Sequence, residues 1–165
     1  RSLLNRTLFV LGRAVTAAAP AGILIWLMAN ITLSGSSLLS LCASFLDPFA
    51  SLFGLDGVIL TGFILGLPAN EIVLPIILMA YLNQGALTEP GSLAGIKDLL
   101  TAQGWTWSTA ACTLLFCLFH WPCATTLLTI RKETASLRWT LLAFLLPTLF
   151  GLVLCFLVAQ GAKLF

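Results

Sequence analysis

Charged side chains are scarce in this chain, which has eight Lys or Arg and six Asp or Glu among 165 residues. Soluble domains carry about 25% charged residues, whereas here 8% are charged and 59% are hydrophobic. A chain this poor in charge cannot cover a soluble globular surface, and it lacks the basic run that would indicate nucleic-acid binding. We therefore expect an integral membrane protein with lipid as much of its solvent.

Sequence motifs of catalysis and of closed metal sites are also missing. The chain has no G-x-x-x-x-G-K-[ST] phosphate loop and no G-x-S-x-G nucleophile elbow. Its five cysteines form no C-x-x-C pair, so we expect neither structural disulfides nor a structural zinc site. Most of them are expected to be small packing groups. The sequence thus predicts a protein that is not an enzyme and holds no permanent cofactor.

Long apolar segments make up most of the chain. Leu8–Ile31 and Trp139–Ala159 are each long enough to cross a hydrocarbon core of about 30 Å. A signal peptide is the alternative for the first, but its apolar region has only about 7–15 residues. Two further segments are broken: Val58–Leu82 at Pro68-Ala69-Asn70-Glu71, and Trp105–Ile130 at His120-Trp121-Pro122-Cys123.

Shorter helices are expected between these segments, at the membrane interface. We predict Leu38–Leu46 and Pro48–Gly54, with Asp47 capping the second of them. An amphipathic helix is predicted near Leu93–Ala102, inside a stretch rich in Gly, Pro and polar residues.

The positions of the basic residues predict the topology. If Val58–Leu82 crossed the membrane, Arg1 and Arg6 would lie opposite the basic loop Arg131–Arg138, against the positive-inside tendency. If Val58–Leu67 and Glu71–Leu82 are instead two arms of a re-entrant hairpin, both basic clusters are cytoplasmic. The prediction is then three full transmembrane helices, with the two ends of the chain on opposite faces, as one half of an inverted repeat requires.

The two breaks carry the candidate site residues. Glu71 follows Pro68 and Asn70 at the start of a half-helix, where free N–H groups favour an anion and Asn70 is placed to cap. Such breaks persist at membrane depth only when buried in protein or lining a cavity. Two interpretations stay open and are compatible: these residues cap the second arm, or they meet a passing cation.

His120 and Cys123 flank the second break, at Pro122. Imidazole and thiolate are good ligands for borderline first-row metals such as Fe(II). The alternative, equally open, is a hydrogen-bonded interior histidine beside a packing cysteine. Thr125 and Thr126 are expected to bond back to helix carbonyls. Gly62 and Gly66 form a small-x-x-x-small pair that predicts a helix contact.

Both breaks lie in segments that resemble FeoB-type ferrous iron transporters. Gly62–Pro75 (GFILGLPANEIVLP) is similar to the second gate segment of that family, and Leu118–Leu127 (LFHWPCATTL) to a later segment. The likeness extends over essentially the whole chain, including Arg6–Ala14. Because the chain starts at Arg1 and lacks a phosphate loop, residues 1–165 are expected to be a single membrane gate domain. They would be a fragment without the family's GTPase domain and first gate repeat.

The resemblance implies Fe(II) uptake across the bacterial cytoplasmic membrane by a multi-pass protein with a nucleoside-transporter-like gate fold. Fe(II) would be the transported substrate, passing near Asn70, Glu71, His120 and Cys123. The expected partners are the bilayer and the missing half, and a homo-oligomer with further copies of the chain is also considered. One alternative is a nucleoside or other small-solute permease half. Another is a non-transporting scaffold that oligomerises through Gly62 and Gly66.

Overall fold

Helices make up nearly all of the computed structural model, which describes residues 2–33, 35–82 and 92–163. The all-α class of membrane fold is confirmed, with one small addition, a ribbon of two two-residue strands. The elements in chain order are α1 (Ser2–Asn30), β1 (Thr32–Leu33), β2 (Ser36–Ser37), α2 (Leu38–Ala50), the 3-10 turn η1 (Ser51–Phe53), α3 (Gly57–Leu65), the 3-10 turn η2 (Asn70–Ile72), α4 (Val73–Leu82), α5 (Leu93–Ala102), α6 (Trp107–Phe119), α7 (Ala124–Thr134) and α8 (Leu137–Lys163). Residues 83–91, which precede the predicted helix α5, lie outside the described residues.

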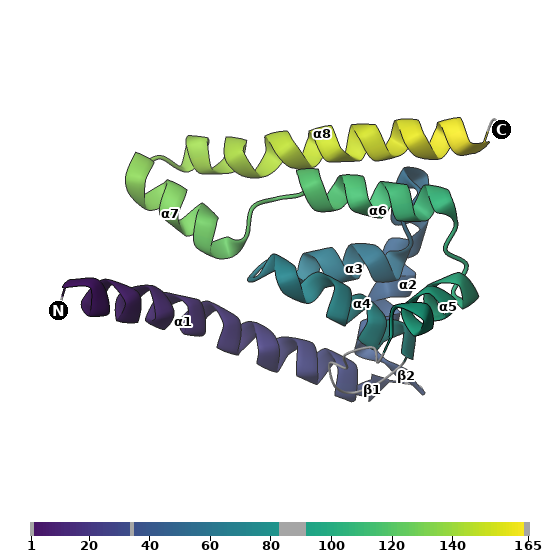
Figure 1. Cartoon of the computed structure of the whole chain (residues 1–165), viewed down its shortest axis with the longest axis horizontal. Helices are drawn as coiled ribbons and strands as arrows, with labels where there is room; N and C mark the ends of the chain where they lie inside the picture. The colour runs from purple at the N-terminus through teal and green to yellow at the C-terminus, as the bar shows by residue number, and fades with distance from the viewer. Residues whose placement is uncertain (1, 34, 83–91, 164–165) are drawn as a thin grey trace.

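The long helices α1 and α8 run along two sides of the molecule, and the pair α3 and α4 lies between them (Figure 1). α8 packs along α6 and α7, whereas α1 contacts α2 and α7. The N-terminal end of α1 and the turn between α7 and α8 lie at one end of the molecule, and the C-terminus lies at the other. This arrangement agrees with both basic segments being on one side of a membrane.

Among the described residues, two helical stretches are long and apolar enough to cross a membrane: Trp107–Thr134, which contains the second break, and Leu137–Lys163. A third candidate arises only if Leu38–Phe53 and Gly57–Leu65, bent by 106° relative to each other, form one span. The described apolar part of α1, Ala18–Asn30, is shorter. The crossing by Leu8–Ile31 therefore stays a prediction.

The arms of the predicted hairpin are α3 and α4, which pack against each other in opposite directions (Figure 1). Two glycines of α3 allow this close approach. A Cβ on Gly62 would lie 2.6 Å from Cγ1 of Ile77, and a Cβ on Gly66 would collide with Val73. The small-residue pair is thus a helix contact, as predicted, but it is buried inside the hairpin. It leaves no glycine surface there for the scaffold alternative.

The α2–α3 corner corrects one prediction. Instead of two helices separated at Asp47, α2 continues through Pro48 to Ala50, because its buried face of Leu39, Ala43 and Ala50 packs without interruption. A proline costs this helix one backbone hydrogen bond near its end, which is tolerable. Asp47 instead supports α3, since its Oδ1 accepts from the N–H of Gly57, the first residue of that helix, at 2.8 Å.

The predicted cap at the hairpin tip is also wrong. The chain tightens into the 3-10 turn η2, so Asn70 lies inside the first helical turn and Ala69 is the capping residue, with no side-chain cap bond. Local backbone bonds satisfy this turn, with the N–H of Ile72 donating to the Ala69 carbonyl at 3.2 Å. The Asn70 side chain is therefore not used to cap the second arm.

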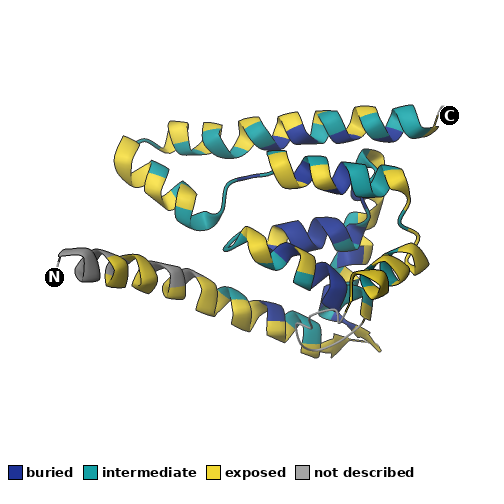
Figure 2. Ribbon diagram, in the orientation of Figure 1, coloured by how far each residue is buried: buried dark blue, intermediate teal, exposed yellow. Residues whose placement is uncertain are grey.

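Buried residues concentrate on α3, α4 and the facing parts of α6 and α8 (Figure 2). Phe63 and Phe116 are fully buried and meet edge to face, with ring centroids 4.8 Å apart. The exposed residues of α1 and α8 are mostly large and apolar, as expected of surfaces that face lipid. The hairpin is therefore the best-packed part of the molecule, and its tip is held in place by this core.

Candidate functional site: a pocket between the two helix breaks

The two breaks, far apart in the sequence, meet in space. α3 ends at Leu65 before Pro68, and α6 ends at Phe119 before Pro122. The N–H of Ala124, the first residue of α7, donates to the carbonyl of Leu67 at 2.8 Å. An unwound carbonyl of one break thus satisfies the free N-terminal N–H of the helix that follows the other. This bond fixes the two breaks against each other.

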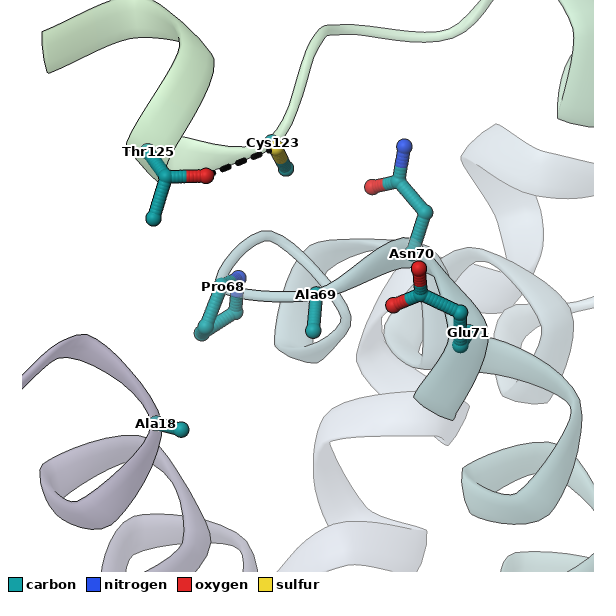
Figure 3. A pocket seen from close by; sticks show the side chains of 7 residues that line it. All are labelled: Ala18, Pro68, Ala69, Asn70, Glu71, Cys123 and Thr125. Carbon is teal, nitrogen blue, oxygen red and sulfur yellow. Dashed lines mark hydrogen bonds between the residues drawn. The ribbon is translucent and has the colours of Figure 1, made fainter. Parts of the chain in front are cut away.

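A pocket of about 250 Å³ opens at this junction. It is lined by residues of α1, the hairpin tip and the start of α7: Ala18, Pro68, Ala69, Asn70, Glu71, Cys123 and Thr125 (Figure 3). Three of the four candidate ligands, Asn70, Glu71 and Cys123, are therefore brought together. Among the lining residues, an amide, a carboxylate, a thiol and a hydroxyl are the groups able to coordinate a cation.

Asn70 and Glu71 enter the pocket from the hairpin tip, where both are exposed. Glu71 lies in the first turn of the helical segment Asn70–Leu82, so the free N–H groups and the positive end of the helix dipole favour its carboxylate. Neither side chain forms a hydrogen bond within the described residues. Their oxygens are accordingly available to a ligand.

Cys123 enters from the other side, as the residue that caps α7. Its Sγ lies 3.1 Å from the hydroxyl oxygens of both Thr125 and Thr126. The sequence predicts that Thr125 and Thr126 bond back to helix carbonyls, and the structure places both hydroxyls against the sulfur of Cys123 instead. In both contacts either atom could be the donor, and a hydroxyl that donates to a sulfur stabilises its thiolate, which is the metal-binding form.

His120 lies outside the pocket lining. Its ring sits among aromatic side chains, with centroids 5.0 Å from Phe63 and 6.0 Å from Trp121. Nδ1 is 3.1 Å from the Phe116 carbonyl and 2.9 Å from the Cys117 carbonyl, so it carries the hydrogen. Nε2 then holds the lone pair and, within the described residues, is buried without a partner. These contacts agree with one of the two interpretations that the sequence left open, a hydrogen-bonded histidine, and His120 is half-buried with one ring nitrogen unsatisfied.

Of the cysteines outside the pocket, Cys112 and Cys155 pack in the core, whereas Cys117 does not. Cys112 and Cys155 are fully buried, and each thiol donates to the carbonyl of the other residue, at 3.6 and 3.2 Å. Cys117 is exposed on α6. Within the described ranges, no three His, Cys, Asp or Glu residues come close enough to hold a metal ion together. From this chain the pocket lining offers one carboxylate, Glu71, and one thiol, Cys123.

Sequence reasoning missed several residues that shape this site. Thr125 and Ala18 line the pocket, and nothing in their own sequence context signals it. Asp56 was missed too, although an Asp directly before an apolar run is an N-cap signal. Its Oδ1 accepts from the N–H of Ile59 at 2.7 Å, which starts α3 and so sets where the hairpin tip falls.

Comparison with known proteins assigns the chain to a family. The family described as "Gate: Nucleoside recognition" matches residues 11–137, more than half of the chain. The Fe(2+) transporters FeoB of Staphylococcus aureus strains MSSA476 and COL are each 38% identical to it over 72 residues. That segment is 44% of this chain and 11% of each relative, so the chain matches only a small part of their length. No solved structure matches the chain. The chain therefore belongs to the Gate, or nucleoside recognition, family, as a membrane part of the FeoB type.

Proposed function

We propose that this chain forms part of a permeation pathway for Fe(II) across the bacterial cytoplasmic membrane, and that the ion passes through the pocket between the two breaks. The observation that carries this proposal is the convergence of Glu71 and Cys123, 52 positions apart in the numbering, on one pocket. Helix breaks at membrane depth commonly provide such ion sites.

The donor set suits a borderline divalent metal. Mg²⁺ and Ca²⁺ prefer oxygen ligands alone, whereas a thiolate beside a carboxylate favours ions such as Fe(II). Asn70 and Thr125 add neutral oxygens to the charged pair Glu71 and Cys123. Since this chain supplies fewer than three strong ligands there, the ion would keep water or take ligands from another part of the protein. Incomplete coordination favours passage over permanent binding.

His120 is retained as a candidate ligand at a second position on the path. Its Nε2 lone pair is the group that would bind, because Nδ1 is engaged by the carbonyls at the end of α6. Reaching it would require the aromatic side chains around it, Phe63 among them, to move. In this proposal, His120 therefore binds the ion only transiently, after the pocket.

The wider assembly is also part of the proposal. Residues 1–165 would be the second gate repeat, with three full crossings, and would work with a first gate repeat and a GTPase domain elsewhere in the parent protein. Supporting this, Glu71 is exposed here and would face lipid unless another membrane half covers it. Assembly of several copies of the chain belongs to the same proposal. Catalysis is assigned to none of these residues.

A nucleoside permease half is the second candidate, favoured by the description of the matching family. The pocket argues against it. A volume of about 250 Å³ lies below the range of about 300–1,000 Å³ usual for organic ligands. Recognition of a base and a ribose would also need more hydrogen-bonding groups than Asn70, Glu71 and Thr125 supply.

The test is Fe(II) uptake by the complete transporter in proteoliposomes, comparing wild type with Glu71→Gln and Cys123→Ser. Loss of the carboxylate charge or of the thiol should each reduce uptake at low Fe(II) by about tenfold or more, the effect of roughly 1.4 kcal/mol. Cys42→Ser, a half-buried cysteine outside the pocket, is the matched control and should transport normally. Wild-type uptake in both pocket variants, or competition by nucleosides and not by Mn(II), would reject the proposal.

A further inference from the structure

A second pocket, of about 460 Å³, lies among α2, α3, α6 and α8. Its lining includes Leu46 of α2, Leu60 and Ile64 of α3, Phe116 of α6 and Leu152 of α8. We call it the apolar pocket, because every residue that lines it is Leu, Ile, Phe or Trp. No helix supplies residues both to this pocket and to the pocket of Glu71. Its volume lies within the range of about 300–1,000 Å³ usual for organic ligands.

The side chains in the walls of the apolar pocket present only carbon. Their one nitrogen or oxygen atom is Nε1 of Trp121, which is buried and has no partner within the described residues. A ligand with hydrogen-bonding groups would leave those groups unsatisfied here, at a cost in free energy. Apolar cavities also stay dry and accept hydrocarbon instead. The lining therefore selects a hydrocarbon over water or a polar ligand.

The depth of the apolar pocket in the bilayer indicates which hydrocarbon is present. Phe144 and Leu152 line it from α8, and at 1.5 Å per residue they lie roughly 9 Å and 21 Å along that helix from Arg138. With Arg138 at the interface, this range includes the middle of a hydrocarbon core about 30 Å thick. Lipid headgroups do not reach this depth, whereas the acyl chains of phospholipids end there.

The apolar pocket is continuous with the surface that faces lipid. Two of its lining residues, Phe49 and Ile64, are exposed. α8, which supplies part of the lining, also exposes Leu145 and Leu149. Since the opening and its surroundings are apolar, an acyl chain enters from the bilayer without passing a polar barrier.

An occupant of the apolar pocket would contact both helix breaks. Leu67 and Trp121 line it, and they directly precede Pro68 and Pro122, the prolines of the two breaks. The carbonyl of Leu67 accepts the hydrogen bond that joins the breaks, and Trp121 stacks on Phe144 with ring centroids 5.6 Å apart. Packing against these two side chains would support the junction of the breaks.

We propose that the apolar pocket is a binding site for one acyl chain of a membrane phospholipid, which packs against Leu67 and Trp121 beside the junction of the two breaks. The site is separate from the pocket of Glu71. This inference does not depend on which solute the protein transports.

The test uses the complete transporter in vesicles of phosphatidylethanolamine and phosphatidylglycerol that contain a trace of phosphatidylglycerol with a photoreactive diazirine near the end of one chain. After illumination, mass spectrometry of proteolytic fragments locates the labelled residues. Leu60 and Trp121 should be labelled, although both are buried from lipid that only surrounds the protein. Leu152→Phe fills the pocket from α8 and Ile64→Phe fills it from α3, so each should reduce labelling of Leu60 and Trp121 by about tenfold.

Leu149→Phe is the matched control, because it makes the same change on an exposed position of α8 outside the pocket lining. It should leave the labelling of Leu60 and Trp121 unchanged. Leu145, exposed on the same helix, should be labelled equally in all variants, which reports that they are folded and inserted. Labelling of Leu145 without Leu60 and Trp121 in the wild type would overturn the proposal and indicate that protein covers the pocket. Undiminished labelling of Leu60 and Trp121 in both filled variants would overturn it as well.

Discussion

At the scale of single residues, the base of the hairpin depends on the only tyrosine of the chain, Tyr81. Its hydroxyl donates to Oδ2 of Asp56 and accepts from Nε1 of Trp105 at 2.7 Å. The other carboxylate oxygen of Asp56 caps α3 through Ile59. One hydroxyl thus joins the start of α3, the end of α4 and the approach to α6. The pocket at the far end of the hairpin depends on this clamp for its position.

Tyr81→Phe removes both hydrogen bonds of the clamp and leaves the ring in place. We expect a loss of roughly 1–3 kcal/mol in stability, because a carboxylate oxygen and an indole N–H lose their partner. Thermal unfolding of the detergent-solubilised transporter measures it. Phe49→Leu, on an exposed position of α2, serves as the control. Equal unfolding temperatures for wild type and Tyr81→Phe would show that the clamp contributes nothing.

At the scale of elements, most helices follow from local patterns. α5 has the predicted bounds Leu93–Ala102, and both broken segments are interrupted at the predicted positions. Hydrophobic runs and prolines are local signals, so sequence alone reveals them. The α2–α3 corner is different: whether Asp47 caps a helix that starts at Pro48 or accepts from the first N–H of α3 depends on a bend of 106° that no local pattern encodes.

Gly57 is the residue that this corner requires. A Cβ there would collide with the backbone carbonyl of Ala43, and backbone cannot move aside as a side chain can. Gly57→Ala should therefore destabilise the protein by about 1–3 kcal/mol, seen as a lower unfolding temperature. Gly22→Ala, where a Cβ meets nothing within 4 Å, should be neutral or slightly stabilising. Similar behaviour of the two variants would refute the close-contact argument.

At the scale of the whole molecule, the arrangement of ends follows from the hairpin. Because α3 and α4 return to the side from which they start, the N-terminal end of α1 and the α7–α8 turn share one end of the molecule, opposite the C-terminus (Figure 1). The charge distribution predicts the same arrangement.

Cysteine labelling tests that topology in cells that express the complete transporter without its native cysteines. Lys163→Cys should react with a membrane-impermeant maleimide from outside, and Lys132→Cys only after permeabilisation. Lys163 ends α8 and Lys132 lies in the last turn of α7, and the C-terminus lies at the end of the molecule opposite the α7–α8 turn (Figure 1). Restoring only the buried Cys112 should give no labelling on either side, which controls for labelling of unfolded protein. Labelling of both engineered positions from the same side would contradict a crossing by α8, one of the three predicted crossings.

The sequence by itself indicated that lipid surrounds much of the chain, where most of the helices lie and where two apolar segments are interrupted. These features depend on composition and periodicity, which are local properties of the chain. It also identified Asn70, Glu71 and Cys123 as candidates, since each stands beside a proline that interrupts an apolar run. Only the tertiary structure decided which of them share a pocket, that Thr125 joins them, and that His120 does not. Contacts such as the hydrogen bond from the N–H of Ala124 to the carbonyl of Leu67 depend on how distant segments pack. Local sequence patterns do not predict that packing.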